Sequence, residues 1–391
     1  MGVSLKNLKT SLALLCVLAL AAAAVASGAL TKANPTRDGH GSMAGMNMTM
    51  THSTGAASSK AVALRITLNE LLGEHAILAI QATQRGLAGG ADFPALAKQL
   101  DANSVAISRA IGSVYGPAAG KQFLNGKNLW RAHIKDFVAY TVATAKHDKA
   151  GQKKAVNDLM TYIQVQAAFF AKATGLPKQA LANDLTAHVL QLKGQLDAYA
   201  SGNYKQAYML TNAAYNHMGM TADLLASAIA KQKGLGSTTG PKANLEVALD
   251  RLLGEHALLA TWATQAGLLG GKNFPALAKQ LDANSVAISQ AIGSLYGPAA
   301  GKQFLNGKNL WRSHINDFVA YTVATAKHDK AGQKKAVNDL TAHVLQLKGA
   351  LDDYNGKRYA ATFALVHGSY VHMYMTGSAL AGGIAKQKGL K

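Results

Sequence analysis

The sequence predicts an all-α protein with two tandem antiparallel helical bundles. Hydrophobic residues make up 49% of the chain, and only 7 of its 391 residues are proline, a composition that suits helices around real cores. From about residue 61 the apolar residues recur with a helical period of 3.6. The stretch Leu71-Leu72-Gly73-Glu74-His75-Ala76 also returns 181 positions later as Leu252-Leu253-Gly254-Glu255-His256-Ala257. We therefore expect about six helices in a first repeat and about five in a second.

Glycine and proline mark the expected helix boundaries. They divide the chain into a first repeat over 61–234, a linker over 235–242 and a second repeat over 243–391. In the first repeat the expected helices span about 61–88, 93–115, 118–148, 150–173, 178–200 and 204–233.

The segment 1–27 has the features of a secretion signal peptide. Lys6 and Lys9 precede an apolar run from Leu12 to Val25, and small residues suit cleavage after Ala26 or Ser27. We expect an exported protein, either secreted or associated with the cell envelope. The mature chain has no cysteine, because Cys16 lies within the apolar run.

The mature chain is expected to be strongly basic. Loss of Lys6 and Lys9 lowers the formal net charge only from +20 to +18. Anionic cell-wall polymers or a membrane surface are the partners that this charge favours. Nucleic acid is excluded as a partner, because the lysines are spread singly along helices without an aromatic platform or a known motif.

Residues 28–60 show no apolar periodicity and are expected to form a flexible, disordered leader. The leader is rich in methionine and histidine. Thioethers select soft ions such as Cu(I) or Ag(I), so the leader is a candidate metal-capture segment. The alternative is a low-complexity tail in which methionine is incidental. The candidate ligands are His40, Met43, Met46, Met48, Met50 and His52.

Four histidines in each repeat are the main candidate site. In the first repeat each stands near the middle of an expected helix and on its apolar stripe. If these helices pack with their ends level, the four imidazoles form one inward layer. The histidines are His75, His133, His188 and His217 in the first repeat, and His256, His314, His343 and His372 in the second.

A metal ion would explain such a layer. A buried neutral imidazole needs partners for both ring nitrogens, and protonated imidazoles would repel one another. Imidazole suits copper or zinc, and neighbouring methionines favour copper. The alternative is that each histidine is a core residue bonded to a neighbouring tyrosine, threonine or asparagine. The further candidate ligands are Glu74, Met218 and Met220, with Glu255, Met373 and Met375 in the second repeat.

Carboxylates near the histidines have several expected roles. Glu74 is either a ligand or the partner of Arg131, and Glu255 and Arg312 repeat this pattern. Aspartates one helical turn from a histidine are candidate outer partners of a metal site. They are Asp184 and Asp136, with Asp339 and Asp317 in the second repeat.

Other function classes fit the sequence less well. A ferritin-like di-iron site needs several carboxylates, and each repeat offers one inward glutamate. Noncovalent haem held by two histidines stays open, although no Cys-x-x-Cys-His is present for covalent attachment. Catalysis would need an open position at the metal, because no nucleophile with a paired base, no phosphate loop and no acid pair is found. A basic structural or adhesive envelope protein with core histidines is the rival hypothesis.

Several motifs resemble those of an uncharacterised family of exported helical proteins from Gram-positive and related bacteria. The motifs are Glu74-His75-Ala76, Ile111-Gly112-Ser113-Val114-Tyr115-Gly116, Trp130-x-x-His133-Ile134 and His217-Met218. The resemblance covers 61–233 and 243–388. Some members of this family are described through an association with copper amine oxidase N-terminal-type domains. The resemblance implies an all-helical exported protein and supplies no activity.

The second repeat lacks the segment that corresponds to 160–185. We expect this loss to fuse two helices into one over about 330–354 and to reverse the last helix, still bringing the four histidines toward one layer. The alternative is that the last helix keeps its direction by docking on the first repeat or on another molecule.

Overall fold

The computed structural model describes residues 59–337 and 342–390. These residues form helices joined by turns, and no strand occurs among them, so the all-α prediction is confirmed. No helix within these two ranges is long and apolar enough to cross a membrane. The predicted signal peptide and nearly all of the Met/His-rich leader, including its six candidate ligands, lie outside the described residues.

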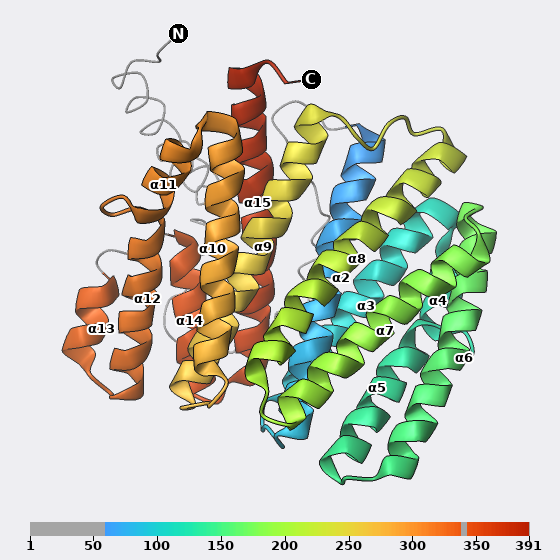
Figure 1. The fold of residues 1–391 in the computed structure, drawn as a ribbon, viewed down its shortest axis with the longest axis horizontal. Helices are drawn as coiled ribbons and strands as arrows, with labels where there is room; N and C mark the ends of the chain where they lie inside the picture. The colour runs from blue at the N-terminus through green and yellow to red at the C-terminus, as the bar shows by residue number, and fades with distance from the viewer. Residues whose placement is uncertain (1–58, 338–341, 391) are drawn as a thin grey trace, which may run out of the picture.

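The first repeat supplies α2 to α8 (Figure 1). They are α2 (Lys60–Leu87), α3 (Phe93–Tyr115), α4 (Pro117–Asn125), α5 (Trp130–Ala145), α6 (Lys149–Thr174), α7 (Lys178–Ala200) and α8 (Tyr204–Lys233).

The second repeat supplies α9 to α15. They are α9 (Pro241–Leu268), α10 (Phe274–Tyr296), α11 (Pro298–Asn306), α12 (Trp311–Ala326), α13 (Lys330–Val337), α14 (Ala342–Asn355) and α15 (Tyr359–Lys388).

The helix expected over 118–148 is wrong, because the structure breaks it into α4 and α5. The break falls at Gly126-Lys127-Asn128, where Gly126 is extended and Asn128 has a φ of 55°. Asparagine tolerates this left-handed conformation better than most residues. Leu129, buried next to the break, then precedes α5 with an extended backbone.

The fused helix expected over 330–354 is also wrong. The structure has two helices, α13 and α14, which lie on either side of α12 in Figure 1. The absent segment corresponds to the second half of α6 and the first third of α7. Its loss shortens a helical hairpin from both sides of its turn, so α14 occupies the place that α7 has in the first repeat.

The prediction that the last helix, α15, is reversed is wrong. The structure has the alternative, in which this helix keeps its direction and docks on the first repeat. In the first repeat Nδ2 of Asn69 on α2 donates to Oδ1 of Asp223 on α8 at 2.8 Å. At the corresponding positions, Oγ of Ser378 on α15 donates to Oδ2 of Asp250 on α9 at 3.0 Å. The two helix pairs therefore have the same antiparallel direction, and α15 additionally contacts α3 of the first repeat.

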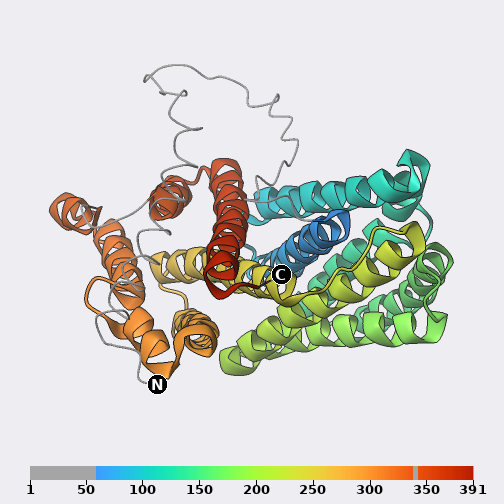
Figure 2. The ribbon, with the colours of Figure 1, turned by 90° about the horizontal axis from the view of Figure 1, so that it is seen from above.

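Two helices are buried over most of their circumference, α2 and its counterpart α9. A helix that is buried all round belongs inside a core rather than on a surface. Figure 2 shows the cyan to green helices of the first repeat on one side and the orange to red helices of the second on the other, with α2, α9 and α15 between them. Helices α2 and α9 also contact each other directly.

The repeats meet around a pseudo-twofold axis. Tyr215 on α8 donates its hydroxyl to the carbonyl oxygen of Arg251 on α9 at 2.8 Å. Its counterpart Tyr370 on α15 donates to the carbonyl oxygen of Glu70 on α2, also at 2.8 Å. Both tyrosines are fully buried. Each repeat therefore inserts the same tyrosine against the same helix of the other.

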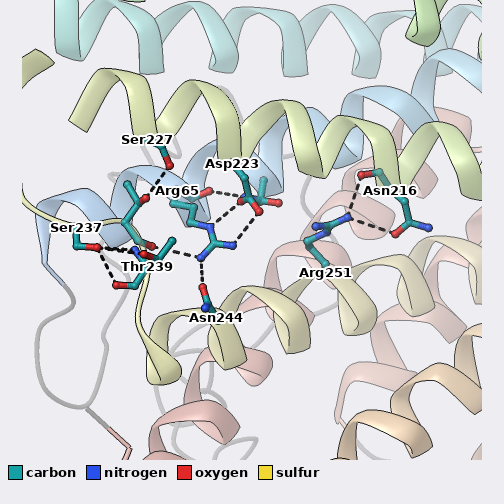
Figure 3. A network of polar contacts seen from close by, with 10 residues as sticks. Arg65, Asn216, Asp223, Ser227, Ser237, Thr239, Asn244 and Arg251 are labelled. Atoms are coloured by element: carbon teal, nitrogen blue, oxygen red, sulfur yellow. Dashed lines mark hydrogen bonds and ion pairs between the residues drawn. The ribbon is translucent and has the colours of Figure 1, made fainter. Parts of the chain in front are cut away.

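The linker is held to the first repeat by Arg65 (Figure 3). The guanidinium forms a bidentate ion pair with Asp223, with nitrogen–oxygen distances of 2.7 and 2.8 Å. It also donates to Oδ1 of Asn244 at 2.7 Å and to the carbonyl oxygen of Thr238 at 3.3 Å. Arg65 thereby ties α2, α8, the linker and the beginning of α9 together.

Replacing Arg65 with methionine should lower the free energy of unfolding by about 2 kcal/mol, because removing one partner of a buried ion pair leaves the other charge unpaired. The loss is moderated here because the Asp223 side chain is 30% exposed. Urea unfolding measures the change. Asn244→Ala is the control and should cost less than half as much. An unchanged stability of Arg65→Met would contradict the role of the network.

Candidate metal centre

The first repeat brings His75 and His133 into direct contact. His75 stands in the middle of α2, and His133 stands one turn inside α5. Their Nε2 atoms are 3.4 Å apart, and both side chains are buried. Two nitrogens bound to one tetrahedral metal at about 2.0–2.1 Å would lie about 3.4 Å apart. The pair therefore has the nitrogen spacing of two ligands on one ion.

The other two histidines form a second pair, His188 on α7 and His217 on α8. Their rings are stacked, with centroids 6.2 Å apart and planes inclined by 12°. His188 is buried, and Nε2 of His217 lies 3.0 Å from the carbonyl oxygen of Asp184. The four histidines of the first repeat, on α2, α5, α7 and α8, are therefore arranged as two pairs, and His188 is near enough to act on the pKa of His133.

Aromatic rings enclose the first pair. Trp130 packs on both imidazoles, with ring centroids 4.6 Å from His75 and 4.8 Å from His133. Tyr162 on α6 stacks on His133, with ring centroids 4.6 Å apart. These rings exclude water from the imidazoles and hold their orientation.

Burial keeps these imidazoles neutral. It lowers the pKa of His133 to about 3, with a smaller contribution from the nearby His188. It also lowers the pKa of His188 to about 3, and here His75 and then His217 add to the effect. The pKa of His75 falls well below its usual value, through burial and then through His133. Each histidine pair therefore lowers a pKa in the other pair. The neutral imidazole is the form that binds metals.

Several ring nitrogens of this cluster have no hydrogen-bond partner among the described residues. They are Nδ1 of His75, Nδ1 of His133 and both nitrogens of His188. A buried polar atom without a partner costs about 1–3 kcal/mol. The alternative prediction, that tyrosine, threonine or asparagine side chains satisfy each imidazole, has some support at His75, because a side-chain hydrogen bond of Asn103 raises its pKa against the larger effect of burial. It does not account for the two nitrogens of His188.

Glu74 does not join the cluster. Its Oε1 lies 2.6 Å from Nδ1 of His367 on α15, and its Oε2 accepts a hydrogen bond from Asn103 at 3.0 Å. The predicted pairing of Glu74 with Arg131 is wrong, because Arg131 forms its ion pair with Asp101 at 2.8 Å. Glu74 is therefore part of the contact between the repeats.

Glu255 repeats this arrangement with a different partner. It accepts hydrogen bonds from Asn284 at 2.9 Å and from Asn212 on α8 at 2.8 Å. Asn212 stands where the second repeat has His367. The expected pairing of Glu255 with Arg312 is wrong as well, since Arg312 pairs with Asp282.

Of the aspartates predicted as outer partners of a metal site, Asp184 lies next to a histidine and Asp136 does not. Oδ1 of Asp184 lies 3.4 Å from Nε2 of His217, although the sequence had suggested His188 as its partner. Asp136 is influenced instead by Asp158 and Lys154, and its pKa is raised first by burial and then by Asp158. Asp339 lies outside the described residues.

The methionines next to His217 and His372 point in two directions. Met218 and Met373 are buried, whereas Met220 is 58% exposed and Met375 is 38% exposed. The two exposed thioethers are therefore separated from the buried histidines, and the buried thioethers of Met218 and Met373 pack in the apolar core.

The second repeat reproduces the first half of the cluster. His256 and His314 have ring centroids 5.6 Å apart, and Trp311 packs on both. Burial lowers the pKa of His314 to about 3, with a contribution from His256. His372 is partly buried, and the side chain of His343 lies outside the described residues. Tyr162 falls in the segment that this repeat lacks.

Within the described residues, no group of three or more histidines, cysteines or carboxylates is close enough to hold a metal ion as it stands. His75 and His133 form a group of two, and His188 is near enough to act on the pKa of His133. A third ligand would have to come from a reorientation of His188.

Three residues of the site were not predicted from the sequence. Trp130 could have been found from its helical spacing, because it is one turn before His133 on the same face. Tyr162 has no such signal, because α6 carries no histidine. His367 has no such signal, since the corresponding residue in the first repeat is Asn212.

Comparison of the chain with protein-family models, with curated proteins and with solved structures finds no match. The family resemblance that the motifs suggest is therefore still an expectation, and the function has to be argued from the site itself.

Proposed function

We propose that this chain is an exported metal-binding protein that sequesters or handles copper, with two tandem helical bundles behind a signal peptide and a Met/His-rich leader. The site in this proposal is the histidine cluster of the first repeat. One observation carries it: four buried histidines from four helices meet, and four of their ring nitrogens have no hydrogen-bond partner within the described part of the chain.

The chemistry of the cluster supports a metal ion over packing alone. The imidazoles of His75, His133 and His188 are held neutral by burial, and two Nε2 atoms already have a ligand-like separation of 3.4 Å. Neither ring nitrogen of His188 is hydrogen-bonded to a residue that the structure describes. A rotation of this side chain toward the His75–His133 pair would therefore break no hydrogen bond among these residues and would supply a third nitrogen.

Copper is the metal that this donor set favours. Among divalent first-row metals, a given nitrogen site binds Cu²⁺ most tightly, ahead of Zn²⁺. The leader would contribute separately, because its thioethers suit Cu(I). In this proposal the leader captures the ion, and the buried cluster retains it.

Replacing His75 or His133 with leucine should remove one tightly bound equivalent of copper from the mature protein. The loss of affinity at that site should exceed the roughly 10–100-fold that outer partners of metal sites contribute. Competition titration with a chromophoric chelator, with elemental analysis of the dialysed protein, measures both quantities. His188→Leu should show the same loss, because the third nitrogen comes from this residue.

The matched control is His147→Ala, because His147 is an exposed histidine on the turn between α5 and α6. This variant should retain the full stoichiometry. Equal stoichiometry in wild type and His75→Leu would assign the cluster to core packing and leave any copper to the leader.

A further inference from the structure

Each repeat contains a mainly apolar pocket between its first helix and its fourth. In the first repeat the pocket has a volume of about 350 Å³ and lies between α2, α3 and α5. In the second repeat the volume is about 310 Å³, and the pocket lies between α9, α10 and α12. Equivalent residues line the two pockets, including Thr83 and His133 in one and Thr264 and His314 in the other.

Small residues on α2 and α9 make the room. Ala79, Ala82, Thr83 and Gly86 line the first pocket, and the same four residue types recur on α9 at 260, 263, 264 and 267. Positions 80, 81 and 85, which lie between them, differ between the repeats. The helix has thus diverged around the pocket but not on the face that lines it.

Exposed valines form part of the lining of each pocket. Val138 and Val142 on α5 are 39% and 47% exposed, and both line the first pocket. Val319 and Val323 have nearly the same exposures at the second. Deeper in the pocket, Phe137 and Leu192 complete an apolar wall. Water is therefore a poor occupant of this space.

We propose that each repeat binds one small neutral molecule, mainly apolar, about two fused rings in size, with one hydrogen-bonding group. An apolar cavity of about 150 Å³ holds one benzene, and these pockets have about twice that volume. Among the described residues, no charged side chain lines the first pocket, which selects a neutral ligand there. The second pocket is lined by Lys327 and by Asp282 and Arg312, which form an ion pair with each other. The polar group of the ligand would meet the neutral imidazole of His133 or a threonine hydroxyl. Ligand pockets of proteins generally combine an apolar wall with a few such polar groups.

The pocket and the proposed metal centre share His133, but binding of the organic ligand does not require the metal. The test therefore uses the mature protein after treatment with a chelator. The probe is 2-naphthol, which is neutral at pH 7 and carries one hydroxyl. Titration calorimetry and the fluorescence of the probe should give two equivalents per chain.

Substitutions that fill the pockets with a larger side chain should remove the two 2-naphthol sites one at a time. Ala79→Leu should leave one equivalent, Ala260→Leu should leave the other, and the double variant should leave none. Ala139→Leu and Ala320→Leu are the matched controls, because these alanines are exposed on α5 and α12 and do not line a pocket. Both should keep two equivalents, and circular dichroism verifies the fold of every variant.

A second variant tests the pocket without adding volume to the core. Val138→Ser at the exposed rim should weaken the first site about 3- to 10-fold, as expected for the loss of apolar contact area. The anionic probe naphthalene-2-sulfonate should be unaffected by any of these changes, since it would bind to the basic surface. Absence of saturable 2-naphthol binding, or two equivalents in the double variant, would overturn the proposal.

Discussion

Acidification from pH 7 to pH 5 should destabilise the metal-free protein by about 2 kcal/mol for each histidine that the fold keeps neutral. The pKa of His133, His188 and His314 is lowered to about 3, mainly by burial. A histidine with a lowered pKa in the folded state contributes stability that is present above about pH 6.5 and is lost as the pH falls below it. One pKa unit corresponds to about 1.36 kcal/mol, and pH 5 lies about 1.5 units below the pKa of a histidine in the unfolded chain. Each histidine therefore gives a loss of about 2 kcal/mol, and the three together give about 6 kcal/mol.

Urea unfolding at pH 7 and at pH 5 measures this loss. His188→Leu should reduce the slope of unfolding free energy against pH by about one proton, because the unfolded chain then has one fewer imidazole to protonate. His147→Ala is the control for the removal of an exposed imidazole. The same pH dependence in wild type and His188→Leu would show that this imidazole is protonated in the folded protein.

Two groups at the repeat interface have the opposite effect, because they make the folded protein more stable as the pH falls. The pKa of Glu70 is raised to about 7, first by burial and then by Glu74. Burial lowers the pKa of His367, but the charge and hydrogen bond of Glu74 outweigh it and raise this pKa overall. Both groups contribute stability at low pH that is lost as the pH rises through the raised value. The unfolding free energy should therefore pass through a maximum near neutral pH.

The second large effect is expected from Gly254→Leu in the middle of α9. A Cβ atom at this position would lie 2.7 Å from Cδ2 of Tyr374 and 2.8 Å from Cε2 of Tyr370, and both rings are fully buried. Leucine favours helix over glycine by roughly 0.5–1 kcal/mol, so any destabilisation comes from packing. Overpacking a core costs about 1–3 kcal/mol for small additions, and we expect more than about 3 kcal/mol for a whole leucine side chain.

Two other glycines provide matched controls in the same unfolding measurement. At Gly73, the counterpart of Gly254, a Cβ atom would be 2.9 Å from Tyr215 and 3.1 Å from the Tyr370 hydroxyl, so Gly73→Ala should be mildly destabilising. At Gly382 on α15 no atom of the described residues lies within 4 Å, and Gly382→Ala should stabilise by about 0.5–1 kcal/mol. Stability unaffected by Gly254→Leu would mean that the tyrosines at the axis are not tightly packed.

The sequence was sufficient for the all-α class and for most helix boundaries, but not for the helices expected over 118–148 and 330–354. Glycine and proline end most helices close to the expected residues, because Gly175 and Gly234 take the left-handed conformation that suits a helix terminus. The four histidines of the first repeat lie on helices of unequal length, and His133 stands one turn inside the 16-residue helix α5 rather than at its midpoint. The helix midpoints expected from the sequence therefore do not explain the position of His133.

The contacts between the repeats could not be predicted in the same way. They join residues some 300 positions apart, such as Glu70 and Tyr370, and no periodicity marks such pairs. The comparison of the repeats gave no signal for His367, because the equivalent residue of the first repeat is Asn212. The contact of His367 with Glu74 could therefore not be predicted. The direction of α15 was also misjudged, since the absent segment is the end of a hairpin rather than one whole pass across the bundle.

The pseudo-twofold contact has a consequence for how such a chain is assembled. When Tyr215 and Tyr370 exchange equivalent bonds across the axis, the interface is isologous, which is the geometry of a symmetric homodimer. Here the two halves are covalently joined by the short segment between α8 and α9, so that association becomes intramolecular at an effective concentration in the millimolar range. Because the halves are no longer identical, one of the two equivalent glutamate contacts has a titratable partner in His367 and the other has a neutral one in Asn212. Tethering thus gives the chain an asymmetry that no homodimer of identical subunits has.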